Sequence, residues 1–212
     1  MFSSSEETEL RQVTELYGKV KELILFCEEN HEEFKSNLHE VKELRDAFDH
    51  LMRIFAVKLG VKEEKNEEYL KINMEKVFGH VYRAGYDTLD YATLILRDKI
   101  NKEVSGFSHS AIQAAIPTYY SEIRPAVESI TSDIIKLRND KDVANRSPEV
   151  FDKYFQNVKN LHKMFDAILK TKPALIEFTN KRKKEQLNDT LVKIAIGIII
   201  GIALAIIGKI FI

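Results

Sequence analysis

The stretch from Leu70 to Ile95, LKINMEKVFGHVYRAGYDTLDYATLI, decides the fold class of this chain. Its apolar residues recur in steps of three and four, the spacing that places side chains on one face of an α-helix. Eight positions share that face: Leu70, Met74, Val77, Val81, Ala84, Thr88, Tyr91 and Ile95. A helix with one long apolar face needs other elements to cover it, so we expect an all-α protein.

The same spacing recurs on both sides of this stretch. Further helices are predicted over 10–27, 41–55, 108–137 and 148–168. We expect Pro117 or Pro125 to kink or break the third of these, and Pro173 to open the last helix. No segment alternates polar and apolar residues as a half-buried strand does. The prediction is therefore a bundle of five to six helices over residues 1–180.

The composition narrows the classes of function. With 32 basic and 33 acidic residues, the formal net charge is −1, so no overall basic field marks a nucleic-acid-binding protein. Cys27 is the only cysteine and lies on an apolar stripe, where we expect a small buried side chain in a reducing compartment. The remaining histidines, His31, His39, His109 and His162, form no ligand set, so neither a metal nor a cofactor is predicted.

The last 22 residues, Leu191–Ile212, read LVKIAIGIIIGIALAIIGKIFI and predict a transmembrane helix. Fifteen uncharged residues lie between Lys193 and Lys209, whose ammonium groups can reach the two headgroup layers. As a helix the segment would extend about 33 Å, close to the thickness of a hydrocarbon core. The alternative is a buried or interfacial helix, which fifteen apolar residues alone would also suit.

The charges around this segment predict its orientation. Residues 181–190 form a basic juxtamembrane segment that contains Lys181, Arg182, Lys183 and Lys184, whereas only Lys209 lies at the far end. Because positive residues stay inside, we expect a single-pass, tail-anchored protein with a cytoplasmic N-terminal domain. The basic residues, with Lys193, would contact the headgroups of the lipid bilayer.

Small residues recur along one side of the predicted span. They are Gly197, Gly201, Ala205 and Gly208. Such a stripe lets helix backbones approach closely, so it favours a homo-oligomer associated through its spans. The alternative is that glycine and alanine are simply frequent in transmembrane helices.

A second segment, Glu43–Phe55 (ELRDAFDHLMRIF), concentrates charged residues within a helical pattern. Apolar residues expected to face the core are Val41, Leu44, Phe48, Leu51 and Phe55. The opposite arc pairs Arg45 with Asp49 and Asp49 with Arg53 at i,i+4, and Asp46 precedes His50 by the same spacing. A solvated ladder of ion pairs explains this arc without any chemistry.

The helix over 70–95 carries a polar stripe of its own. The stripe consists of His80, Arg83, Asp87 and Asp90. If the two helices are antiparallel neighbours, the stripe would meet Asp46, His50 and Arg53. Opposite charges between helices more often fix the packing of those helices than perform catalysis.

The residues Arg45-Asp46-Ala47-Phe48-Asp49-His50 resemble the R-(N/D/H)-x-x-x-H motif of the HEPN superfamily of helical nucleases and nucleotide-binding proteins. The resemblance implies metal-independent RNA cleavage at a dimer interface. His50 would move a proton during attack by the 2′-hydroxyl, Arg45 would stabilise charge on the phosphoryl group, and Asp46 would orient both. Histidine and arginine side chains suit these tasks.

Three classes of function remain open. The first is a self-associating effector or adaptor at the membrane, of antiviral or toxin type, whose bundle binds a protein or a signal. The second is a membrane-tethered ribonuclease, with RNA as a partner only under the HEPN resemblance. The third is a structural tether. Since the anchor is the clearest feature of the chain, we rank the effector or adaptor first.

Overall fold

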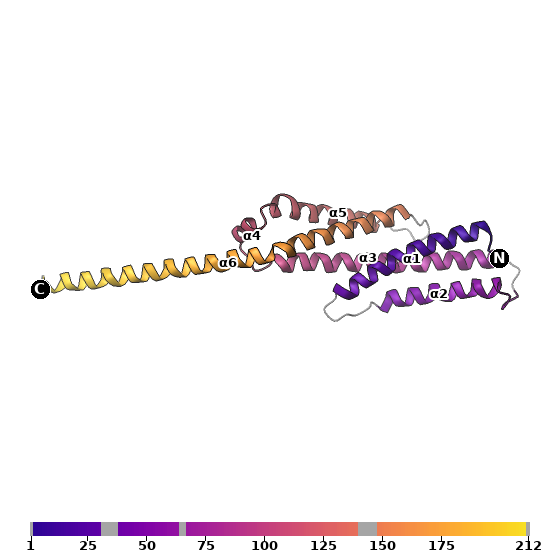
Figure 1. Cartoon of the computed structure of the whole chain (residues 1–212), viewed down its shortest axis with the longest axis horizontal. Coiled ribbons are helices and arrows are strands. Elements are labelled where there is room, and N and C mark those ends of the chain that lie inside the picture. Colours follow the sequence, from indigo (N-terminus) through magenta and orange to yellow (C-terminus); the bar gives the residue numbers. More distant parts are fainter. Residues whose placement is uncertain (1, 31–37, 64–66, 140–147, 211–212) are drawn as a thin grey trace. The chain divides into compact units, whose positions relative to one another are not determined.

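The computed structural model describes residues 2–30, 38–63, 67–139 and 148–210, with side chains as far as Ile202. Every regular element in these residues is helical, which confirms the all-α prediction (Figure 1). The elements are α1 (Ser4–Asn30), α2 (Leu38–Lys58), α3 (Glu67–Val104), α4 (His109–Ala115), the π-helix η1 (Tyr119–Ile123), α5 (Arg124–Asn139) and α6 (Pro148–Ile210).

The chain divides into two compact units. Unit 1 comprises Met1–Asn101 and Ala126–Phe165, and unit 2 comprises Lys102–Pro125 and Asp166–Ile212. Helix α3 supplies most of the core of unit 1. The apolar face predicted for it is buried at five positions, Met74, Val77, Val81, Ala84 and Thr88. The other three positions of that face are partly buried.

Aromatic rings and small residues connect α3 to α1 and α6 within unit 1. The ring of Tyr86 is fully buried and meets Phe151 edge-on, with centroids 5.5 Å apart. Cys27 of α1 lies against the carbonyl of Thr88, and burial raises the pKa of its thiol to about 12. Cys27 is therefore a small buried side chain, as expected, and very little of it is thiolate at neutral pH.

Gly85 lies where these helices approach one another closely. A Cβ at this position would lie 2.7 Å from Phe151 Cε2 and 2.8 Å from Val20 Cγ2. We expect Gly85→Ala to lower the free energy of unfolding by about 1–3 kcal/mol, because two core side chains must shift. Gly18 of α1 is the matched control, since a Cβ there meets nothing within 4 Å.

Gly18→Ala should instead raise the free energy of unfolding by about 0.5–1 kcal/mol, through helix propensity alone. Urea titrations of both variants measure the two effects. Equal effects of the two substitutions would contradict the close packing at Gly85.

The break expected near the prolines is present in unit 2. The Ser108 hydroxyl caps α4 by accepting from the Ala111 amide at 3.2 Å. Helix α4 ends at Ala115, before Pro117, and Pro125 lies in the first turn of α5. This part of the prediction is confirmed.

The prediction that Pro173 opens a new helix was wrong. Helix α6 continues through Pro173, which is exposed. Proline removes one backbone hydrogen bond but keeps a helical φ, and an exposed position lets water satisfy the freed carbonyl. Ile168 and Leu175 are buried on either side of Pro173. Continuing the same helix through Pro173 therefore costs less free energy than nucleating a second helix.

Candidate functional site

Helices α2 and α3 run antiparallel and meet through polar side chains. His39 Nε2 lies 3.2 Å from Asp87 Oδ2, Glu43 Oε2 lies 2.8 Å from His80 Nδ1, and His50 Nδ1 lies 2.9 Å from Asn73 Oδ1. As the residue number rises on α2 it falls on α3, which is the antiparallel arrangement. We call this set the polar seam; its members are His39, Glu43, His50, Asn73, His80, Arg83 and Asp87.

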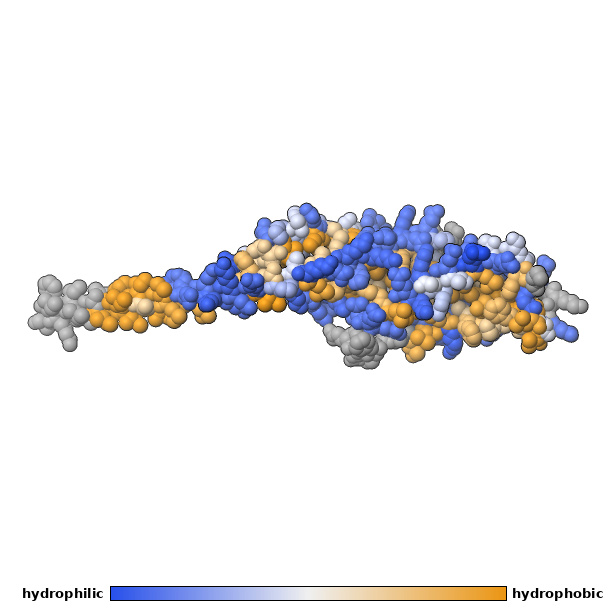
Figure 2. All heavy atoms as spheres, in the orientation of Figure 1, coloured by the Kyte–Doolittle hydropathy of each residue, from blue (hydrophilic) through white to orange (hydrophobic). Residues whose placement is uncertain are grey.

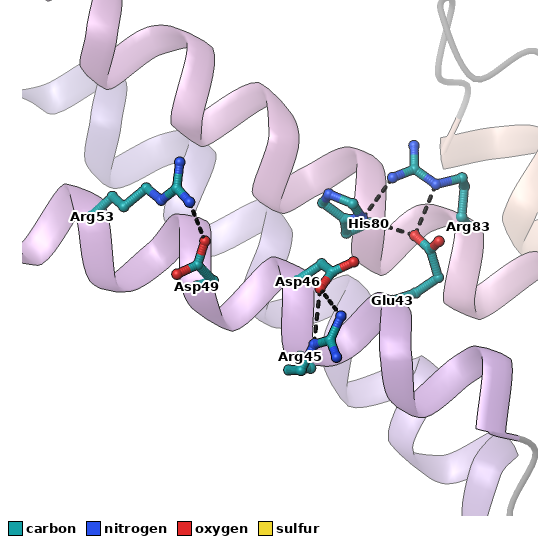
Figure 3. A network of polar contacts seen from close by, with 7 residues as sticks. All are labelled: Glu43, Arg45, Asp46, Asp49, Arg53, His80 and Arg83. Atoms are coloured by element: carbon teal, nitrogen blue, oxygen red, sulfur yellow. Dashed lines mark hydrogen bonds and ion pairs between the residues drawn. The ribbon is translucent and has the colours of Figure 1, made fainter.

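Glu43 is the centre of the polar seam. Its carboxylate points from α2 toward α3, where it contacts His80 and accepts from Arg83 Nε at 2.8 Å (Figure 3). Burial raises the pKa of Glu43, but the hydrogen bonds and charges of His80 and Arg83 outweigh burial and hold it below its ordinary value. Glu43 therefore stays ionised and paired at neutral pH.

His50 is held by two contacts inside the polar seam. Since Asn73 Oδ1 can only accept, His50 Nδ1 carries the proton of their hydrogen bond. Asn73 is buried, and its amide nitrogen donates to the Tyr69 carbonyl at 2.7 Å. The His50 ring also stacks on His80, with centroids 5.4 Å apart. These contacts fix the tautomer and the orientation of His50.

Arg45 and Asp46, the other two residues of the HEPN-like motif, pair with each other. Arg45 NH2 lies 2.6 Å from Asp46 Oδ1, and hydrogen bonding to Arg45 lowers the pKa of Asp46 below its ordinary value (Figure 3). The Arg45 side chain is 68% exposed. Arg45 contacts Asp46 on its own helix, while His50 contacts Asn73 and His80 of α3.

The remaining polar residues divide between the polar seam and other surfaces. His80, Arg83 and Asp87 meet α2, but of the expected partners Asp46, His50 and Arg53 they contact His50. Their carboxylate and imidazole partners on α2 are otherwise Glu43 and His39. Arg53 instead pairs with Asp49 at 2.6 Å along α2. Asp90 accepts from Tyr154 at 2.6 Å and lies 3.1 Å from Arg138, so it belongs to the contacts of α3 with α6 and α5.

Glu43, His39 and Asn73 were not predicted to contribute to the contacts between α2 and α3. A signal for two of them was present, because residues 39, 43 and 50 are spaced by four and seven and share one face of α2. Asn73 carried no such signal, since nothing in the sequence distinguishes a buried asparagine from one at the surface.

The prediction of the core-facing side of α2 was partly wrong. Val41 and Phe48 were expected in the core, yet they are 49% and 59% exposed. The buried residues of α2 are Glu40, Ala47 and Ile54. Apolar residues cover more than half of the circumference of α2. The helix can therefore place its polar side chains against their partners on α3, bury Ala47 and Ile54, and leave Val41 and Phe48 exposed.

The polar seam gives a test of its own. We expect Glu43→Gln to lower the free energy of unfolding by about 1–3 kcal/mol at pH 7, since His80 and Arg83 lose a charged partner. The pKa of Glu43 is lowered on folding, so this contribution is complete above its ordinary value of 4.5 and disappears as pH falls through the folded-state pKa. The difference between variant and parent should shrink accordingly in acid.

Asp49→Asn is the matched control on the same helix. Its ion pair with Arg53 is solvent-exposed, so we expect a change below about 0.5 kcal/mol. Urea titrations from pH 3 to 7 measure both variants. A Glu43 effect as small as that of Asp49 would contradict the central place of Glu43.

The last part of α6 is the second notable feature. Its large apolar side chains are 50–65% exposed and cover most of the circumference of the helix, apart from the side that carries Lys193, Gly197 and Gly201. They are Leu191, Val192, Ile194, Ile196, Ile198, Ile199, Ile200 and Ile202. Figure 2 shows this apolar surface directly after the hydrophilic surface of residues 181–190.

Part of the predicted span lies outside the residues whose side chains are described. Ala205 and Gly208 of the small-residue stripe belong to that part. Within the residues that the structure describes, no helix combines the length and the apolar character needed to cross a bilayer.

The geometry limits the chemistry available in unit 1. Across the described residues, no three His, Cys, Asp or Glu side chains are placed to hold a metal ion. Two cavities of 290 and 260 Å³ are lined by α1, α3 and residues 148–152, and not by Arg45, Asp46 or His50.

Comparison with protein-family models, with curated proteins and with solved structures finds no match. RNA cleavage by the HEPN-like motif stays a prediction.

Proposed function

We propose that this chain is a membrane-anchored adaptor or effector, which uses α6 to hold a helical interaction bundle at the cytoplasmic surface of a bilayer. One observation carries the proposal. From Leu191 to Ile202 the large apolar side chains of α6 are at least half exposed and cover most of its circumference. A helix that is apolar all round needs either a protein core or lipid to cover it.

Lipid is the better solvent for this surface. Covering a large aliphatic side chain is worth about 1.5–3 kcal/mol, so eight such residues strongly favour transfer out of water. An α-helix also satisfies its own backbone hydrogen bonds, as the bilayer interior requires. Residues 203–208 extend the apolar sequence further, so that the whole segment from Leu191 to Ile212 suits a span.

The basic residues before the span support the proposed orientation. Lys181, Lys183 and Lys184 are exposed, and Arg182 donates to the Ser110 hydroxyl. Exposed basic residues beside a span favour the cytoplasmic side and attract anionic headgroups, at about 1 kcal/mol per charge.

Self-association through the span is part of the proposal. A Cβ at Gly197 or Gly201 would meet nothing within 4 Å. Packing within the chain therefore does not require glycine at either position. Close approach of a second span, along a stripe continued by Ala205 and Gly208, would use both glycines.

An interaction protein fits the polar seam better than an enzyme does. Glu43, His50, His80 and Arg83 contact one another or Asn73, and Arg45 is paired with Asp46. Such mutual pairing fixes how α2 packs on α3, which is a structural task.

Carbonate extraction of membranes tests the anchor. We expect the full chain to remain in the membrane pellet, and a chain ending at Glu185 to be released. Recovery of the full chain in the soluble fraction would overturn the proposal.

A further inference from the structure

Helix α2 exposes a regular apolar stripe away from the polar seam. The outer stripe, as we call it, consists of the apolar residues Leu38, Val41, Phe48 and Met52 together with Arg45. Leu38, Phe48 and Met52 are 81%, 59% and 39% exposed, and Val41 is 49% exposed. Figure 2 shows hydrophobic surface along the edge of unit 1 that α2 forms.

The spacing of the outer stripe is that of a coiled coil. Its residues follow one another at intervals of three, four, three and four, which are the a and d positions of a heptad repeat. Phe55 continues the repeat and is partly buried. An apolar stripe of this spacing buries itself best against another helix of matching spacing, by knobs-into-holes packing.

We propose that the outer stripe binds the outer stripe of a second copy of this chain, with the two α2 helices antiparallel. The charges beside the stripe favour this partner. Lys42 and Asp49 are exposed and both occupy the e position of the repeat. In an antiparallel pair, e positions face each other, so Lys42 of each copy meets Asp49 of the other.

The antiparallel register also accommodates Arg45. When Val41 lies opposite Met52 of the second copy, Arg45 lies opposite Phe48 of the second copy. A guanidinium over an aromatic ring is a favourable contact, and the aliphatic stem of Arg45 can pack on the apolar stripe. A parallel pair would place the two Arg45 side chains in one layer, where like charges repel.

This pairing extends the proposed function by naming the partner of the bundle. It leaves the polar seam intact, because the outer stripe and the polar seam lie on different sides of α2. The test below does not depend on membrane retention, so failure of the pairing and failure of the anchor are distinguishable.

Cysteine cross-linking of the full chain in mild detergent tests the register. Val41→Cys and Met52→Cys are made in separate chains, while the native Cys27 is buried and unreactive. We expect oxidation to give a covalent dimer when the two chains are mixed, and none when either is oxidised alone. Dimers from each chain alone would show parallel pairing and overturn the proposal.

Two substitutions test the energetics by analytical ultracentrifugation of the full chain in the same detergent. We expect Phe48→Glu to weaken dimerisation about 100-fold, as loss of a central aromatic contact does. Leu94→Glu on α3, at a position 57% exposed, is the matched control and should change dimerisation little. A dimer insensitive to Phe48→Glu, or a monomeric parent, would overturn the proposal.

Charge reversal tests whether the partner of the outer stripe is a second copy of this chain or another molecule. We expect Asp49→Lys to weaken dimerisation about tenfold, and Lys42→Asp in the same chain to restore it, because both intermolecular pairs re-form. No restoration would contradict the register.

A fluorescent maleimide should label the Phe48→Cys variant rapidly when it is monomeric. Protection of this cysteine in the monomer would mean that the chain covers its own outer stripe, and would overturn the proposal.

Discussion

Replacing Ile199, Ile200 and Ile202 together by lysine should release the full chain from membranes. Each lysine near the middle of a span adds about 2.5–3.5 kcal/mol to the cost of insertion, and each lost isoleucine adds a few tenths more. The sum, about 8–12 kcal/mol, corresponds to a change of roughly 10⁶–10⁹-fold in partitioning. Flotation of the variant with vesicles measures the loss.

The matched control carries leucine at the same three positions. Leucine is as apolar as isoleucine and keeps the helix, so this variant should float with the vesicles like the parent. If the lysine variant also floated, α6 would not be the part of the chain that holds it to the bilayer.

The second large effect concerns His50. If the HEPN-like motif cleaves RNA, His50→Ala should lower the cleavage rate by about 10²–10⁴, with little change in the melting temperature. The contacts of His50 with Asn73 and His80 lead us to expect the other outcome. Loss of about 1–3 kcal/mol should lower the melting temperature by about 2–10 °C, and the parent should show no cleavage to be lost.

Incubation of the full chain with RNA in EDTA, together with thermal melts of parent and variant, distinguishes the two outcomes. Arg45→Ala is the informative companion variant, because within its own chain Arg45 is exposed and contacts Asp46 of the same helix, so its loss should lower the melting temperature less than loss of His50. Cleavage by the parent that both substitutions abolish would establish the enzyme in place of the adaptor.

The helices of unit 1 could be predicted because their apolar spacing is nearly unbroken. Met74, Val77 and Val81 lie in the core as their spacing indicated. The same reasoning failed for Val41 and Phe48, since α2 is apolar over more than half of its circumference. For such a helix, partners in other elements decide which apolar residues are covered, and the sequence of α2 alone does not contain that information.

The candidate site was predictable only in part for a similar reason. His80 and Arg83 were expected to meet Asp46, His50 and Arg53. His80 does stack on His50, but the carboxylate that His80 and Arg83 contact is Glu43 rather than Asp46. Either carboxylate suits the spacing, and the rotation of α2 about its axis selects between them. Pro173 was overinterpreted as the start of a helix. An exposed proline within a long helix costs too little free energy to end that helix.

The depth of α6 in a bilayer is the most direct test of the central claim. Nitroxide labels on Ile202→Cys and Gln186→Cys, in the full chain in nanodiscs, report contact with oxygen or with a water-soluble nickel chelate. Ile202 lies about 16 Å beyond Leu191 along the helix, near the middle of the hydrocarbon core. We predict that Ile202 contacts oxygen but not nickel, and that Gln186 contacts nickel. Equal contact of both positions with the nickel chelate would contradict a membrane-spanning α6.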